Sequence, residues 1–277
     1  MKTSRREAPS ASQEPMDASH ATRADAASMP LYRVGGVAAL MIAVFFLIEL
    51  MGVIATGLPP STVIGWFTLI QHDRLRALFD LFCLDMLAMT LSVPLFLALY
   101  AALRRASPWF MALATVLAFV GIAVYFASNT AFNLLSLSDY YAAATTAAQR
   151  SLFEAAGQAA LAGITSSPGS SLGIYMGFTL PAIAGLIISV VMLRSTVFSK
   201  ATAFVGILGN VLQFGPPSQF VPASWDSFFV VLVGVAGVVL VIWYVLIALK
   251  LFQLARGISK EEVNQPAEAE DHESHRG

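Results

Sequence analysis

The sequence predicts an all-α protein that crosses a membrane several times. Its 277 residues are 57% hydrophobic and only 12% charged, with a mean hydropathy of +0.72, whereas soluble domains carry about 25% charged residues. Apolar runs of roughly 20 residues recur along the chain, which is the length that a membrane-spanning helix needs. Basic residues gather on alternate connections between these runs, as they do in multi-span proteins.

The two ends of the chain differ from its middle. Residues 1–33 form a polar, Ala/Ser-rich arm, and residues 257–277 form a tail with an acidic tract at 268–271. Neither end carries enough apolar surface to offset the entropy lost on ordering, so we expect a disordered cytoplasmic arm and a disordered cytoplasmic tail. The first apolar run is longer than the apolar core of a signal peptide, about 7–15 residues. It is therefore interpreted as a retained span, and the membrane domain covers residues 34–256.

Six apolar segments are candidates for spans. Five have sufficient length: 34–58, 78–103, 109–130, 172–193 and 228–251. The sixth, 201–214, would be roughly 21 Å long as a helix and is followed by Gly215-Pro216-Pro217. By length alone it fits a short span or a re-entrant segment equally well.

The distribution of basic residues favours six spans with both termini in the cytoplasm. Of the 16 Lys and Arg residues, only Arg74, Arg76 and Arg150 then lie outside. If segment 201–214 did not cross, the four basic residues after it would move outside, and the bias would nearly disappear. Because cytoplasmic flanks are rich in Lys and Arg, the sequence predicts a six-span bundle.

Residues 139–164, between the third and fourth spans, predict an amphipathic helical lid on the outer surface. Asp139 suits a helix start, and Ser151 to Glu154 fits a capping box, so the lid is one helix or two. Small and apolar residues recur at helical spacing, at Tyr141, Ala144, Ala148, Leu152, Ala155 and Ala159. We expect this face to pack inward.

Three carboxylates fall within predicted spans: Glu49 in the first, Asp80 and Asp85 in the second. Ionisable groups inside a membrane usually face the protein interior or a cavity. The helical rise places Glu49 and Asp85 at similar depth in the outer half of the bilayer. Asp80 lies nearer to water and is expected to be structural. Asn129 and Asn210 should reach the same depth, so the sequence predicts a small outward-facing polar pocket.

The Glu49–Asp85 pair has two interpretations. In the functional one, the two carboxylates bind a proton or a cation. In the structural one, which is favoured at this stage, they form hydrogen bonds that fix the register of the helices, or they pair with Arg74 or Arg76. The first hypothesis for the whole chain is accordingly a non-enzymatic membrane protein. The alternatives are a transporter or a proton- or cation-coupled permeation component, and a lipid-modifying enzyme with a carboxylate base.

The fourth predicted span carries a stripe of small residues four positions apart: Gly173, Gly177, Pro181 and Gly185. Such a stripe lets another helix approach closely. The sequence leaves open whether that helix belongs to the same chain or to a second copy in a homo-oligomer. Pro181 removes one intrahelical hydrogen bond and should kink its helix, as should Pro94 in the second span.

Several functional classes are disfavoured. None of the four histidines lies in a predicted span, so a bis-histidine haem is not expected. The single cysteine, Cys83, and the lack of an HExxH motif predict no metal site. Phosphate- and dinucleotide-binding glycine motifs are missing, and no cofactor is expected. With a net charge of −1, the expected partners are membrane lipids and no nucleic acid.

The stretch from about Tyr32 to Arg256 resembles a family of uncharacterised bacterial membrane proteins with about six or seven predicted spans, a domain of unknown function. The resemblance rests on Arg33-Val34-Gly35-Gly36 and on residues 76–85, 149–161 and 198–210. It implies a multi-pass protein of the bacterial inner membrane. It supplies no activity and no catalytic residues, and the long polar arm exceeds what this family usually shows.

Overall fold

The computed structural model describes residues 28–79, 84–161, 172–214 and 226–274, and helices are the regular elements found among them. Five segments are long and apolar enough to cross a membrane. Four of them contain α2 (Met29–Thr56), α5 (Leu84–Leu103), α6 (Pro108–Ser128) and α9 (Leu172–Arg194), and the fifth, Gly234–Gly257, is part of α11 (Asp226–Ser274). A sixth apolar helix, α10 (Lys200–Leu212), is shorter. The remaining helices are α3 (Val63–His72), α4 (Arg74–Leu78), α7 (Ala131–Ala143) and α8 (Ala147–Leu161).

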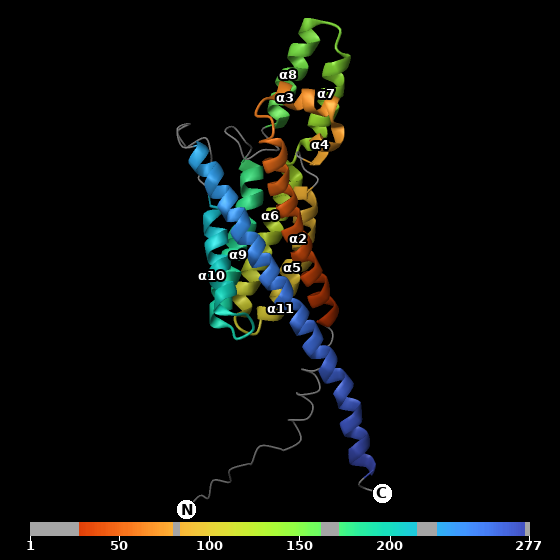
Figure 1. The fold of residues 1–277 in the computed structure, drawn as a ribbon, viewed down its shortest axis with the longest axis vertical. Coiled ribbons are helices and arrows are strands. Elements are labelled where there is room, and N and C mark those ends of the chain that lie inside the picture. Colours follow the sequence, from red (N-terminus) through yellow and green to blue (C-terminus); the bar gives the residue numbers. More distant parts are fainter. Residues whose placement is uncertain (1–27, 80–83, 162–171, 215–225, 275–277) are drawn as a thin grey trace, which may run out of the picture.

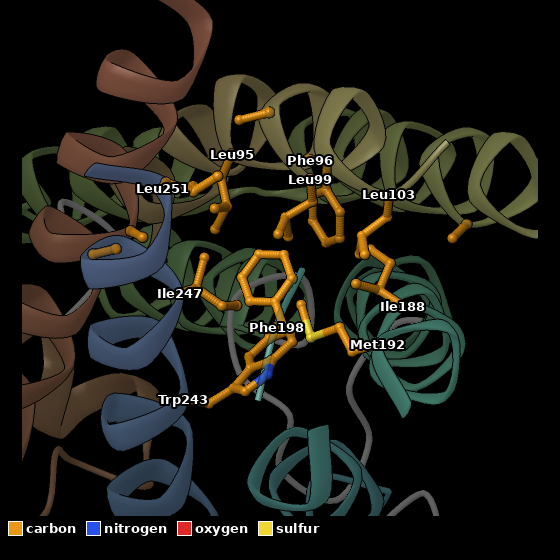
Figure 2. Packing of buried hydrophobic residues seen from close by; sticks show 14 of the residues in the cluster. Leu95, Phe96, Leu99, Leu103, Ile188, Met192, Phe198, Trp243, Ile247 and Leu251 are labelled. Atoms are coloured by element: carbon orange, nitrogen blue, oxygen red, sulfur yellow. The ribbon is translucent and has the colours of Figure 1, made fainter. Parts of the chain in front are cut away.

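The six apolar helices form a closed ring (Figure 1). Helix α2 packs on α5 and α11, α5 on α6, α6 on α9, α9 on α10, and α10 on α11. All six helices contribute to one buried apolar cluster, and Figure 2 shows its part between α5, α9 and α11. There, Leu103, Ile188, Met192 and Ile247 are essentially inaccessible to solvent. The first and last helices of the chain therefore close one bundle.

The short helix α10 belongs to this ring like the longer ones. Ser199 caps its start by accepting a hydrogen bond from the backbone N–H of Thr202. Its small residues Gly206 and Gly209 are buried against the neighbouring helices. The start of α2 and the far end of α11 lie at the same end of the bundle (Figure 1). This arrangement agrees with the six-span fold that the sequence predicts.

Two helix boundaries differ from the sequence expectation. Helix α2 begins at Met29, with Pro30 in its first turn, because Tyr32 is already buried in the bundle core. Helix α11 continues to Ser274, although we expected a disordered tail from residue 257. The tail carries several glutamates, which favour helix even without packing partners. Most of the predicted arm, residues 1–27, lies outside the described residues.

Helices α3, α4, α7 and α8 form a separate cap at the other end of the bundle (Figure 1). The cap has its own apolar core, in which Trp66, Phe67 and Ile70 of α3 pack against Ala131 and Leu134 of α7, together with residues of α8. Polar contacts join the same elements: the Gln71 Nε2 donates to the Ser138 Oγ across 3.0 Å. The predicted helical region between spans 3 and 4 is therefore confirmed.

The geometry of this region differs from the predicted lid. It projects away from the bundle (Figure 1), and it includes α3 and α4 from the first connection. The buried face of α8 is Gly157, Ala160 and Leu161, whereas Leu152 is 64% exposed. Gly157 sets this face, since a Cβ there would lie 2.5 Å from Cγ2 of Val63. Asp139 lies inside α7 and starts no helix.

The small-residue stripe of α9 packs against helices of the same chain. A Cβ at Gly177 would lie 2.8 Å from Cβ of Tyr125 on α6, and Pro181 lies directly against Gly121 of α6. Gly185 lies against the Asn210 side chain of α10. These positions are thus covered within one chain. A homo-oligomer stays a prediction.

Candidate functional site

Two membrane helices bring the predicted carboxylates together. Glu49 lies two turns before the end of α2 at Thr56, and Asp85 lies in the first described turn of α5. Because α2 runs toward the cap and α5 runs away from it, both positions fall at the cap end of the bundle (Figure 1). Both side chains are half-buried. Their carboxyl groups lie close enough for their charges to interact.

The tight approach of α2 and α5 sets this geometry. Gly35 of α2 lies so close to Ala98 of α5 that a Cβ at position 35 would overlap with the alanine methyl group. Helices α2 and α5 are packed neighbours in the ring. Because α2 and α5 are antiparallel neighbours, side chains at matched depth on their facing sides meet. The positions of Glu49 and Asp85 are consequences of that pairing.

A third group of the cluster, Tyr125 on α6, was not predicted from the sequence. Its side chain is 2% exposed, and its hydroxyl lies close enough to Asp85 and Glu49 for electrostatic interaction. The Asn129 Nδ2 donates a hydrogen bond to this hydroxyl across 3.2 Å. The four-residue spacing between Tyr125 and Asn129 was the available signal, because such residues share one face of a helix.

Asn129 joins this cluster to the cap. It follows the last residue of α6, and its Oδ1 accepts a hydrogen bond from the backbone N–H of Ala131, the first residue of α7. The neighbouring Thr130 Oγ1 donates to the carbonyl oxygen of Ala160 on α8, across 2.5 Å. We call Glu49, Asp85, Tyr125 and Asn129 the polar cluster. It lies where the membrane bundle meets the cap.

Asn210, which was expected in the pocket, has contacts elsewhere in the bundle. The Asn210 side chain is 3% exposed and lies against Gly185, and its Nδ2 donates to the carbonyl oxygen of Gly206 across 2.7 Å. Asn210 thus serves the α9–α10 contact, while α10 itself packs chiefly on α9 and α11. Its described contacts are with α9 and with its own helix. Asp80 lies outside the described residues.

Arg74 and Arg76, which could have paired with the carboxylates, contact Asp139 and Thr56 respectively. The Arg74 guanidinium forms an ion pair with Asp139 of α7 at 3.2 Å. The Arg76 Nη2 donates to the carbonyl oxygen of Thr56, at the end of α2. Arg74 therefore stabilises the cap, and Arg76 ties the cap to the first membrane helix.

The chemistry of the polar cluster is that of oxygen ligands. It offers two carboxylates, one phenol and one amide, which are hard donors suited to a proton or a small cation. Within the described ranges, no group of three or more His, Cys, Asp or Glu side chains that could hold a metal ion is found.

No family model, curated protein or solved structure matches this chain. The apolar helices nevertheless identify a multi-pass membrane protein. The chemical character of the site therefore has to be argued from its own residues.

Proposed function

We propose that this chain is a non-enzymatic, six-span protein of a bacterial inner membrane, with a small polar pocket that opens on the outer side and binds a proton or a small monovalent cation. The electrostatic interaction between the half-buried carboxylates of Glu49 and Asp85 carries the proposal. Two like charges that interact in a low dielectric repel each other. A proton or a bound cation relieves that repulsion.

The environment of the pair supports binding over a purely structural role. Arg74, one of the two arginines that could have neutralised the pair, forms an ion pair with Asp139. The Tyr125 hydroxyl, held by Asn129, adds an oxygen ligand beside the two carboxylates. Ionisable groups inside a membrane commonly mark the path or the binding site of an ion.

The proposed orientation follows from the charges at the two ends of the bundle. Arg104 and Arg105 lie between α5 and α6, and Arg194 and Lys200 flank the connection between α9 and α10. These connections lie at the end opposite the cap (Figure 1). Since cytoplasmic flanks are rich in basic residues, the cap and the polar cluster are assigned to the outer side. The resemblance of residues 33–36 and 198–210 to a bacterial family supports the inner membrane.

The test is ion-dependent stabilisation of the full chain in detergent. We expect the thermal midpoint to rise with the concentration of Na⁺ or K⁺ relative to a bulky organic cation, because a ligand that binds only the folded state stabilises it. The variants Glu49→Gln and Asp85→Asn should lose this dependence. Glu154→Gln in the cap, which is also half-buried, should retain it.

Three outcomes separate the hypotheses. If Na⁺, K⁺ and protons all leave the midpoint of the wild type unchanged, the pair is structural and the proposal is wrong. If binding occurs and proteoliposomes also show an ion flux that both variants lose, the transporter or coupled-permeation alternative replaces a binding-only role. Lipid turnover by the purified protein that disappears in Asp85→Asn would instead establish the lipid-modifying enzyme.

A further inference from the structure

The end of the bundle opposite the cap gathers basic residues from several helices. We call it the basic end. Its described basic residues, all exposed except for the half-buried Lys250, are Arg33, Arg104, Arg105, Arg194, Lys200, Lys250 and Arg256. The described carboxylate side chains lie in the cap or in the cap half of the bundle, at Glu49, Asp73, Asp85, Asp139 and Glu154. Among the side chains that the structure describes, those of the basic end are cationic and attract anions, although the sequence of α11 beyond Gly257 is acidic.

The packing beneath this end brings part of the surface together. Leu103 of α5, Met192 of α9 and Phe198 belong to the same buried cluster (Figure 2). Each is followed within two residues by an exposed basic residue: Arg104, Arg194 and Lys200 respectively. No ion pair with another described residue is found for these three side chains. They lie at the end of α5, the end of α9 and the start of α10, next in sequence to residues of one packed cluster.

Apolar side chains next to these cations face outward. Trp109 is 85% exposed at the start of α6, and Phe110 beside it is 53% exposed. On α10, Phe204 is 61% exposed one turn after Lys200. A basic residue beside an outward apolar side chain is the pattern of a helix end at a bilayer surface, where cations meet headgroups and aromatic rings lie at the interface.

We propose that the basic end binds the anionic headgroups of phospholipids in the adjoining leaflet, with Arg104, Arg194 and Lys200 as principal contacts. Charge complementarity selects an anion, and the neighbouring apolar surface selects a lipid over a soluble phosphate. The proposal is independent of the polar cluster, which lies at the other end of the bundle. It predicts a preference for phosphatidylglycerol over phosphatidylcholine.

The test uses the full chain in detergent, with native mass spectrometry to count bound phosphatidylglycerol and phosphatidylcholine. We expect the wild type to prefer phosphatidylglycerol by about tenfold, since several cations contribute. The triple variant Arg104→Gln/Arg194→Gln/Lys200→Gln should lose the preference while keeping the thermal midpoint of the wild type. The matched control Arg74→Gln/Arg150→Gln removes basic residues from the cap region and should keep the preference.

Two results would overturn the proposal. One is a folded triple variant that prefers phosphatidylglycerol as the wild type does. The other is inorganic phosphate at millimolar concentration that binds to the wild type and displaces the lipid, which would identify a soluble anion as the ligand. If the triple variant fails to fold, salt titration of the wild type decides: the preference should fall as NaCl screens the charges, and a salt-independent preference contradicts the proposal.

Discussion

The side chain of Asn129 donates a hydrogen bond to the hydroxyl of Tyr125 one helical turn earlier, across 3.2 Å. The same tyrosine packs its Cβ against Gly177 of α9. Tyr125 thus takes part both in a close helix–helix contact and in the polar cluster. Because Asn129 also accepts from the N–H of Ala131, this pair connects the membrane bundle to the first cap helix after it.

The Tyr125–Asn129 pair should show measurable coupling. We expect Asn129→Ala to lower the free energy of unfolding by about 1 kcal/mol, the net contribution of a typical hydrogen bond. Tyr125→Phe keeps the ring against Gly177 and should cost less. Urea or thermal unfolding of both single variants and the double variant gives the coupling energy. Strictly additive losses would show that the observed hydrogen bond contributes nothing.

The α6–α9 contact should not tolerate a larger side chain. Gly121 lies against Pro181, so Gly121→Leu forces the two helices apart and should destabilise the protein by about 1–3 kcal/mol. Gly52→Leu is the matched control, because a Cβ at that position meets nothing within 4 Å. Thermal unfolding in detergent should show a lower midpoint for position 121 only. Equal midpoints would mean that the close approach is not maintained in solution.

The ion pair of Arg74 and Asp139 should contribute little to stability. Its side chains are 56% and 48% exposed, and exposed pairs contribute about 0–1 kcal/mol. Ser138 beside it is completely buried and contacts Gln71. We therefore expect Ser138→Val to lower the melting midpoint of the cap more than Arg74→Gln does. If Arg74→Gln lowers the midpoint more than Ser138→Val does, surface charges stabilise the cap more than the buried serine does.

The crossing of α10 can be tested by cysteine labelling. In a Cys83→Ser background, single cysteines are introduced at exposed positions: Thr196→Cys before α10, Gly257→Cys near the membrane end of α11, and Ser151→Cys in the cap. With six spans, a membrane-impermeant reagent labels positions 196 and 257 from one side and position 151 from the other. Labelling of 196 and 257 from opposite sides would show that α10 does not cross.

Much of the fold was predictable from the sequence because the membrane imposes simple length and charge rules. Apolar length located five helices, and the basic residues around 201–214 predict that the shorter α10 crosses as well, which stays a prediction. The cap was only partly predicted. Helix α3 carries a visible signal, since Thr62 caps it and Val63, Trp66, Phe67 and Ile70 share one face. The lengths of the connections between spans, however, do not reveal which of their helices pack against each other.

The candidate site shows where sequence reasoning stops. The rise per residue gives the depth of a side chain, and depth placed Glu49 beside Asp85. The direction in which a side chain points around the bundle depends on the order of helices in the ring, which depth does not give. Asn210 was matched in depth but faces Gly185, on another wall of the ring. Tyr125 was missed because an aromatic residue in a span is usually part of the core.

The pairing of α2 with α11 has a consequence for biosynthesis. Helix α11 leaves the ribosome after the other described helices, because a chain emerges from its amino terminus onward. Gly36, which packs against Phe252 of α11, faces lipid or an assisting protein until α11 has been made. A chain that ends before α11 would leave the sides of α2 and α10 that face α11 uncovered. These uncovered surfaces would be a target for quality-control proteases.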